Sequence, residues 1–119
     1  MARCRRALPS KPLSGYRLMW IMVMFDLPVD TAANRKAAAD FRNSLKDMGF
    51  IMAQYSVYMK YTSGQTECDS LTKRVHDRLA DGGRVYVHCL TDRQYEKIVR
   101  FEKKQRLEAQ KNPEQFQLF

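Results

Sequence analysis

The spacing of hydrophobic residues along this 119-residue chain alternates between the period of a strand and the period of a helix. Residues 16–27 are apolar at both alternating positions, which predicts a strand covered on both faces. Residues 31–48 predict a helix, capped by Asp30 or Thr31 and ended by Gly49. Its apolar stripe at helical spacing consists of Ala33, Ala37, Phe41, Leu45 and Met48.

The remainder of the chain repeats this order. Residues 50–61 alternate with period two and predict a strand, bent or split near 54–56. Its apolar face includes Val57 and Met59, and the other, more polar face includes Tyr58. A capping pattern at Thr66 and Asp69 predicts a second helix that runs to about Asp81. The inward residues of this second helix are expected to be Cys68, Leu71, Val75 and Leu79. Further elements are predicted at 84–90 (strand), 94–97 (short turn or helix), 98–101 (short strand) and 115–119 (terminal strand), with 103–114 as a solvated connector.

This order of elements predicts an α+β sandwich in which both helices cover one face of a small, mainly antiparallel sheet. The face that carries Trp20, Met22 and Met24 would then be an exposed apolar patch, so we expect a homodimer packed through the sheets. The domain organisation follows from these elements. We expect a flexible basic arm at 1–14, one domain at 15–102, and a connector with a C-terminal strand at 103–119 that joins the dimer sheet.

The charge of the chain adds a prediction about its partner. Lysine and arginine number 21 against 13 acidic residues, so the formal net charge is +8 and the pI is near 9.6. Such a balance favours a polyanion, most commonly nucleic acid, although a basic protein without such a partner has the same composition. No apolar run reaches the ~18 residues of a membrane span. Three cysteines without a paired motif, and no secretory signal, predict a cytosolic protein with reduced thiols.

Asp26 is the candidate for chemistry, because it ends the apolar first strand just before Pro28. An ionised carboxylate at a buried strand end needs a partner. In a two-fold dimer two copies of Asp26 could approach each other and hold a cation, and Mg²⁺ suits oxygen ligands of this kind. The alternative is that Asp26 accepts backbone donors of the following loop in an Asx-turn.

Basic residues near this strand end are candidates for contacts with phosphate groups. Arg35 and Lys36 lie near the start of the predicted helix, where a positive charge is unfavourable because of the helix dipole. Nearby phosphate groups would explain this placement. The alternative is that both side chains are solvated cations on the surface. Asp30 could be an acceptor beside the Asp26 site or a helix cap. The phosphate candidates are Arg35, Lys36, Arg42 and Lys60, together with the N-terminal arginines.

Two motifs in the chain, and the distance between them in the sequence, resemble those of a known family. Residues 22–28, from Met22 to Pro28, precede a helix that contains Asn34 and Arg35. After this helix come Gly49-Phe50 and then the second motif, residues 54–58, with the sequence Gln-Tyr-Ser-Val-Tyr. Over about residues 16–101 the chain resembles the second universal CRISPR-associated protein, most closely members from systems with a single large effector nuclease.

The resemblance implies a ferredoxin-like fold and a homodimer whose C-terminal strand joins the sheet of its partner. It also implies a place in the spacer-acquisition complex, where the dimer bridges dimers of the CRISPR integrase (the first universal CRISPR-associated protein) and binds duplex DNA. Family members are also described as Mg²⁺-dependent endonucleases that act on RNA or DNA. The metal-binding aspartate of the family matches Asp26, and a family arginine matches Arg35.

Three functions are therefore compared. The first, which the sequence favours, is a non-catalytic DNA-bridging subunit that binds duplex DNA largely without sequence specificity, with RNA as an alternative ligand, because no base-reading element is evident. The second is a Mg²⁺-dependent endonuclease that cleaves single-stranded RNA or duplex DNA through Asp26. The third is an RNA-binding module outside any CRISPR complex, which lacks the expected aromatic and glycine strand signature.

Overall fold

The computed structural model describes residues 18–107 of the chain. The predicted basic arm and the predicted terminal strand at 115–119 lie outside the described residues. No helix in the described part is long and apolar enough to cross a membrane. The elements are β1 (Met19–Asp26), α1 (Ala32–Asp47), β2 (Ile51–Gln54), β3 (Val57–Thr62), α2 (Gln65–His76), β4 (Arg84–Thr91), α3 (Asp92–Glu96), β5 (Arg100–Glu102) and β6 (Gln105–Leu107).

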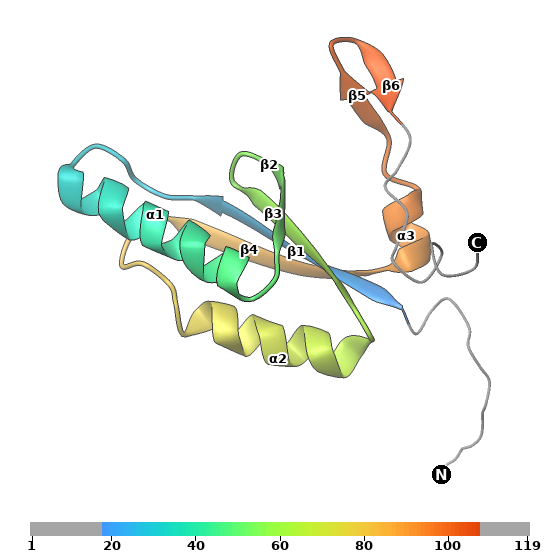
Figure 1. Cartoon of the computed structure of the whole chain (residues 1–119), viewed down its shortest axis with the longest axis horizontal. Coiled ribbons are helices and arrows are strands. Elements are labelled where there is room, and N and C mark those ends of the chain that lie inside the picture. Colours follow the sequence, from blue (N-terminus) through green and yellow to red (C-terminus); the bar gives the residue numbers. More distant parts are fainter. Residues whose placement is uncertain (1–17, 108–119) are drawn as a thin grey trace.

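Four strands form the main sheet in the order β2-β3-β1-β4, and every neighbouring pair is antiparallel. The helices α1 and α2 lie together on one side of this sheet (Figure 1). A β-α-β-β-α-β order with this arrangement is the ferredoxin-like fold, so the predicted fold class is confirmed. The predicted split of residues 50–61 is also confirmed, since β2 and β3 form a hairpin around Ser56, whose φ is 72°.

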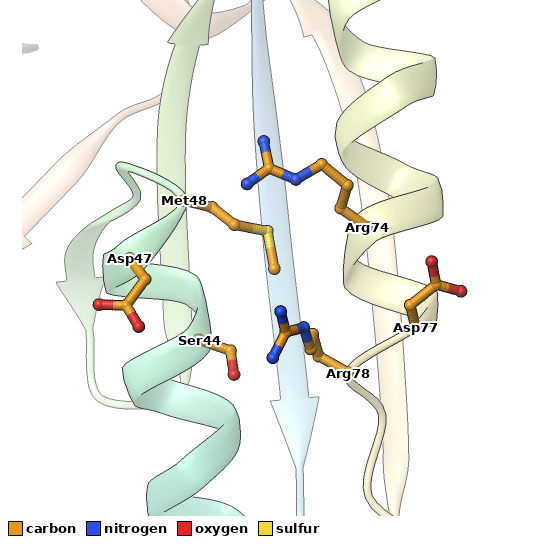
Figure 2. Close-up of a pocket in the computed structure, with 6 residues that line it drawn as sticks. All are labelled: Ser44, Asp47, Met48, Arg74, Asp77 and Arg78. Atoms are coloured by element: carbon orange, nitrogen blue, oxygen red, sulfur yellow. The ribbon is translucent and has the colours of Figure 1, made fainter.

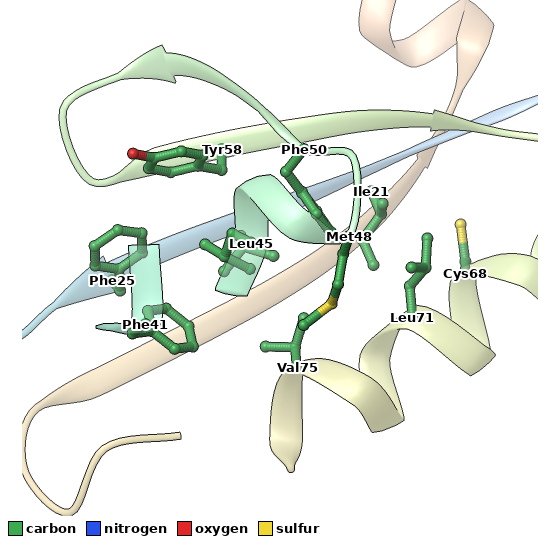
Figure 3. Close-up of a cluster of buried hydrophobic side chains, with 11 residues drawn as sticks. Ile21, Phe25, Phe41, Leu45, Met48, Phe50, Tyr58, Cys68, Leu71 and Val75 are labelled. Carbon is green, nitrogen blue, oxygen red and sulfur yellow. The ribbon is translucent and has the colours of Figure 1, made fainter. Parts of the chain in front are cut away.

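The main core lies between the sheet and the two helices (Figure 3). Ile21, Val23 and Phe25 of β1 meet Phe41 of α1, and Phe25 packs edge-on against Phe41 with ring centroids 5.1 Å apart. Tyr58, which the sequence assigned to the polar side of its strand, is 1 % exposed in this core. This assignment was wrong because both faces of β3 are covered, so the alternation of polar and apolar residues did not show which side chains are buried.

A second apolar cluster covers part of the opposite face of the sheet. Trp20 stacks on Tyr95 of α3 with ring centroids 4.0 Å apart, and its indole Nε1 donates to the Asp92 carboxylate at 2.8 Å. Met59 and Leu90 complete this cluster. The expectation that the whole Trp20 face is uncovered in one chain is therefore wrong at Trp20, since α3 covers it. We refer to this side of the sheet as the open face.

The helix ends follow local rules in one helix and depart from prediction in the other. Thr31 caps α1, because its side chain accepts from the backbone N–H of Asn34 at 3.0 Å. In α2 the capping residue is Gly64, without a side-chain cap, so the predicted Thr66 cap is wrong. That helix ends at His76, and Leu79 is 43 % exposed rather than inward. Ala33, which was predicted to belong to the apolar stripe of α1, is exposed, and Ala38, which was not, is buried.

A two-stranded hairpin of β5 and β6 follows α3 and projects away from the main sheet (Figure 1). The strand at Gln105–Leu107 lies where the sequence predicted only a solvated connector. Its turn places Lys103 and Lys104 at φ values of 52° and 68°. Both values lie in the left-handed region, which favours glycine or asparagine, and this explains why the composition of the turn did not predict a hairpin.

Candidate functional site

Asp26 lies at the last position of β1, on the open face of the sheet. Its side chain is exposed, contrary to the expectation of a buried strand end, because the apolar cover of α3 reaches Trp20 and not Asp26. Within the described residues the Asp26 side chain makes no hydrogen bond or ion pair, so the structure does not show the Asx-turn that was the alternative to a cation site. The carboxylate is available to a ligand.

Two residues that sequence reasoning missed lie beside Asp26. In the antiparallel register Arg84 is directly opposite Asp26, and Tyr86 is directly opposite Met24. Residues opposite each other point to the same side of the sheet, so all four side chains project from the open face. They line a hollow of about 270 Å³ together with Phe25. The signal was present in the ferredoxin-like order, which places the start of β4 beside the end of β1.

Gly83 sets the position of Arg84 relative to the end of β1. Its φ is +86°, in the left-handed region. A Cβ at Gly83 would overlap the backbone oxygen of Asp26 and lie 2.9 Å from Cα of Leu27. Glycine is therefore required twice here, for its backbone conformation and for the close approach of the two chain segments. The strand end that carries Asp26 is held against the start of β4.

The loop from Asp26 to α1 is held by polar contacts of its own residues. The side-chain amide of Asn34 donates to Asp30 at 2.8 Å, which lowers the pKa of that carboxyl group. The Arg35 guanidinium donates to the carbonyl oxygen of Val29 at 3.1 Å. Thr31, rather than Asp30, is the helix cap. Arg35 thus braces the loop after Asp26, and its remaining donors are free to face solvent.

The other predicted phosphate candidates are spread over the helix side of the molecule. Lys36 forms an exposed ion pair with Asp40 at 3.1 Å. The Arg42 guanidinium lies over the Tyr55 ring, 5.6 Å from its centroid. Lys60 is partly buried, with its ammonium 4.0 Å from Glu67. The structure therefore does not bring Arg35, Lys36, Arg42 and Lys60 together at Asp26.

A second hollow lies between α1 and α2, where Arg74 of α2 and Arg78, just after the end of that helix, reach toward α1 (Figure 2). Arg74 and Arg78 line it with Ser44 and Met48, and its volume is about 220 Å³. Asp47 and Asp77 contribute to the same lining, so two cations are balanced by two anions. The hollow also lies at the C-terminal ends of both helices, where a positive side chain complements the helix dipole.

Asp26 and its neighbours provide too few ligands to form a complete metal site within one chain. Among residues 18–107 no three His, Cys, Asp or Glu side chains cluster as metal ligands. Mg²⁺ is commonly held by one or two carboxylates while water and phosphate oxygens fill the other positions. One exposed Asp26 fits a site of that kind if a second chain or a phosphate group completes it. The fit is to a water-rich cation site and not to a cage made by this chain alone.

Comparison with known proteins identifies the family. The model for the family "CRISPR associated protein Cas2" matches residues 19–98. A protein of Paracidovorax avenae named CRISPR-associated endoribonuclease Cas2 is 51 % identical over 107 residues, which cover 90 % of this chain and 99 % of that protein. Proteins with the same name from Flavobacterium psychrophilum and Parvibaculum lavamentivorans are 37 % and 39 % identical, over 90 % and 85 % of this chain and 93 % and 100 % of theirs. The resemblance noted in the sequence is thereby confirmed, and this chain belongs to the CRISPR-associated Cas2 family.

Proposed function

We propose that this chain is a Mg²⁺-dependent endoribonuclease whose reaction takes place at Asp26. The observation that carries the proposal is the exposed Asp26 carboxylate, which has no side-chain partner among residues 18–107 and lies opposite Arg84 in an open hollow. Polar side chains that converge on an open hollow without pairing with each other are candidates for ligand binding and chemistry. The relatives reported above are named endoribonucleases, which favours RNA as the substrate.

The chemistry follows from the charges at this strand end. A bound Mg²⁺ would help water attack phosphorus and would stabilise the negative charge that develops on the phosphate. Asp26 would hold the cation through a carboxylate oxygen. Arg35 would keep the Asp26 loop in place through its bond to Val29. The chain thus supplies orientation and charge on a rigid strand end.

We further propose that the active form is a homodimer packed through the open faces. Met22 and Met24 are only half-buried in one chain, and Tyr86 is 61 % exposed. A second copy would cover this apolar surface and would bring a second Asp26 to the cation. Such a dimer would explain why each chain carries a single carboxylate at the site.

Cleavage assays of the wild type and Asp26→Ala test the nuclease proposal. Single-stranded RNA and duplex DNA would each be incubated with Mg²⁺ and with chelator. We expect RNA cleavage that needs Mg²⁺ and disappears in Asp26→Ala. Asp47→Ala is the matched control, because Asp47 is also exposed but lies at the end of α1. Cleavage that persists in Asp26→Ala would contradict the proposal.

A second candidate function is the DNA-bridging subunit of the spacer-acquisition complex, bound to dimers of the CRISPR integrase in the cytoplasm. The specific observation in its favour is charge, since each chain carries a formal +8 and a dimer would carry twice that. Binding to duplex DNA would then release counterions and weaken steeply with salt. This function needs no catalytic metal.

Duplex binding and integrase association distinguish the two functions. For the bridging subunit, duplex affinity should survive Asp26→Ala and should weaken in the charge reversals Arg35→Glu and Lys36→Glu. If those reversals leave both the affinity and its salt dependence unchanged, the proposed phosphate surface is wrong. If the purified chain does not associate with the integrase, the bridging function itself is refuted.

A further inference from the structure

We propose that Tyr55 and Arg42 form a platform for one nucleotide of single-stranded RNA, with the base on the Tyr55 ring and a phosphate group on the Arg42 guanidinium. The inference rests on the proposed nuclease function, because it names residues that would position the RNA cleaved at Asp26. The platform lies on the helix side of the sheet, and not on the open face.

The turn between β2 and β3 lies beside the strand end that carries Asp26. The carbonyl oxygen of Ser56 in this turn accepts a hydrogen bond from the backbone N–H of Phe25 at 3.0 Å. Phe25 directly precedes Asp26 in β1, and Tyr55 directly precedes Ser56 in the turn. The backbone thus places Tyr55 within reach of a nucleotide that adjoins a phosphate group at Asp26.

Helix α1 brings Arg42 to the same turn. Phe41 of α1 packs against Phe25, and Arg42 is the next residue of the helix (Figure 3). Its guanidinium carbon lies 5.6 Å from the centroid of the Tyr55 ring, which is within the range of a cation–π contact. Since α1 lies on the side of the sheet opposite the open face, a second copy packed on the open face would leave this pair accessible (Figure 1).

The neighbours of Arg42 distinguish it from other basic candidates on the helix side. Lys36 pairs with Asp40 at 3.1 Å, and the Lys60 ammonium lies 4.0 Å from Glu67, so both charges have a carboxylate nearby. Among residues 18–107 the Arg42 guanidinium makes no ion pair and no hydrogen bond, and it contacts an aromatic ring instead. Its donors therefore remain available for the oxygens of a phosphate group.

Tyr55 offers the flat surface that a base needs. Its side chain is 72 % exposed, so it contributes little to the core even with Arg42 over its ring. Aromatic rings beside basic residues are the common platform for single-stranded nucleic acid, since every base can stack. Ring and guanidinium together match the two parts of one nucleotide.

Fluorescence anisotropy with a labelled single-stranded RNA, in chelator so that no cleavage occurs, tests the platform. We expect Tyr55→Ala to bind about tenfold more weakly, whereas Tyr55→Phe, which keeps the ring, should bind like the wild type. Arg42→Gln should also bind about tenfold more weakly and should lower the salt slope by about 0.7, as expected for one phosphate contact of a single strand. Arg74→Gln is the matched control, because Arg74 is an exposed arginine near the end of α2. If Tyr55→Ala and Arg42→Gln bind no more weakly than Arg74→Gln, the inference is overturned.

Two further probes separate the assigned roles. On an RNA backbone without bases the loss in Arg42→Gln should persist, because the phosphates remain, and the loss in Tyr55→Ala should disappear. An equal loss in Tyr55→Ala on both RNAs would mean that Tyr55 only holds the turn, and would overturn its role toward a base. On duplex DNA Tyr55→Ala should bind like the wild type, because paired bases are not free to stack. A tenfold loss there would contradict the assignment to single strands.

Stability, molar mass and cleavage keep the result interpretable. Tyr55→Leu keeps apolar bulk in the turn without a ring, so it should bind RNA as weakly as Tyr55→Ala and unfold at the temperature of the wild type. A changed molar mass in solution would assign Tyr55 to contact between copies and would refute the platform. If the wild type binds RNA as expected but does not cleave it in Mg²⁺, the nuclease proposal fails while the platform stands. If it cleaves RNA and both variants bind normally, the platform fails alone. With cleavage, Tyr55→Ala should raise KM more than it lowers kcat.

Discussion

Two hollows in this molecule each combine arginine with aspartate, and they differ in what explains the charges. The hollow at the end of β1 holds one Asp26 and one Arg84 beside apolar and aromatic side chains. The hollow between α1 and α2 holds Arg74 and Arg78 with Asp47 and Asp77. In the second, the C-terminal ends of two helices account for the arginines, because helix dipoles favour cations there. At the end of β1 no helix end accounts for Arg84, and Asp26 and Arg84 form no ion pair among the described residues.

This difference shows how a charged hollow can be assigned a role. Cations at the C-terminal end of a helix stabilise the helix through its dipole, so they need no ligand to explain them. Asp26 and Arg84 line an open hollow but do not pair with each other among the described residues, so a ligand is the better explanation of these charges. Size does not distinguish the two hollows, since their volumes are about 270 Å³ and 220 Å³.

Charge reversal in each hollow gives the largest expected contrast. Arg84→Glu should weaken binding of single-stranded RNA about 100-fold, because repulsion of the phosphate replaces a charge-assisted hydrogen bond. Arg78→Glu makes the same change of net charge and should weaken it less than about threefold, through the general field alone. Anisotropy titrations of both variants at one salt concentration provide the comparison. Similar losses in the two variants would mean that RNA senses only net charge.

The second prediction concerns the glycine that positions Arg84. Gly83→Ala should lower the free energy of unfolding by about 2 kcal/mol, because a Cβ overlaps the Asp26 backbone and the left-handed φ is strained. Gly82→Ala is the control, since its Cβ would lie 3.3 Å from a flexible ring atom of Pro28. Urea denaturation measures both. If Gly83→Ala is as stable as Gly82→Ala, the close approach is relieved by loop movement.

The same strand end shows how far the sequence could be interpreted. The position of Asp26 at the end of the first strand, and a helix cap at Asp30 or Thr31, were predictable because each depends on residues adjacent in the chain. The exposure of Asp26 was not predicted, because it depends on how far α3 covers the sheet. Arg84 was missed because it lies 58 positions after Asp26, and only the strand register brings the two together. The ferredoxin-like order was predicted, and following it to the register would have found Arg84.

Elsewhere, predictions failed where tertiary cover changed the meaning of a local pattern. Trp20 was expected to need a second chain, but Tyr95 of the short helix α3 stacks on it. Tyr58 was assigned to the polar side of its strand and lies in the main core. The hairpin at Gln105–Leu107 was missed since two lysines occupy a turn that usually contains glycine. The predicted dimer, the metal and the integrase partner stay predictions.

A smaller effect is expected in the hollow between the helices. The double variant Arg74→Gln, Arg78→Gln should lose about 0.5–1 kcal/mol of stability, because the last turn of α2 loses favourable interactions with its dipole. The loss should shrink at high salt, which screens exposed charges. Thermal unfolding at low and high salt measures it, with Arg84→Gln as the control that should not change. A loss that is equal at both salt concentrations would point to lost packing instead.

The smallest effect concerns Asp30, which, unlike Asp26, has a side-chain partner in the part of the chain that the structure describes. The hydrogen bond from Asn34 lowers the pKa of Asp30 below its ordinary value of 3.8, and backbone donors lower it further. A lowered pKa means that the ionised form is the one stabilised by folding. This contribution is therefore present above the ordinary value and is lost as the pH falls through the folded value. Asn34→Ala should raise the pKa of Asp30 toward 3.8, as followed by NMR titration of its carboxyl carbon. An unchanged pKa would assign the shift to the backbone donors of the loop, and the loop would then hold Asp30 without help from α1.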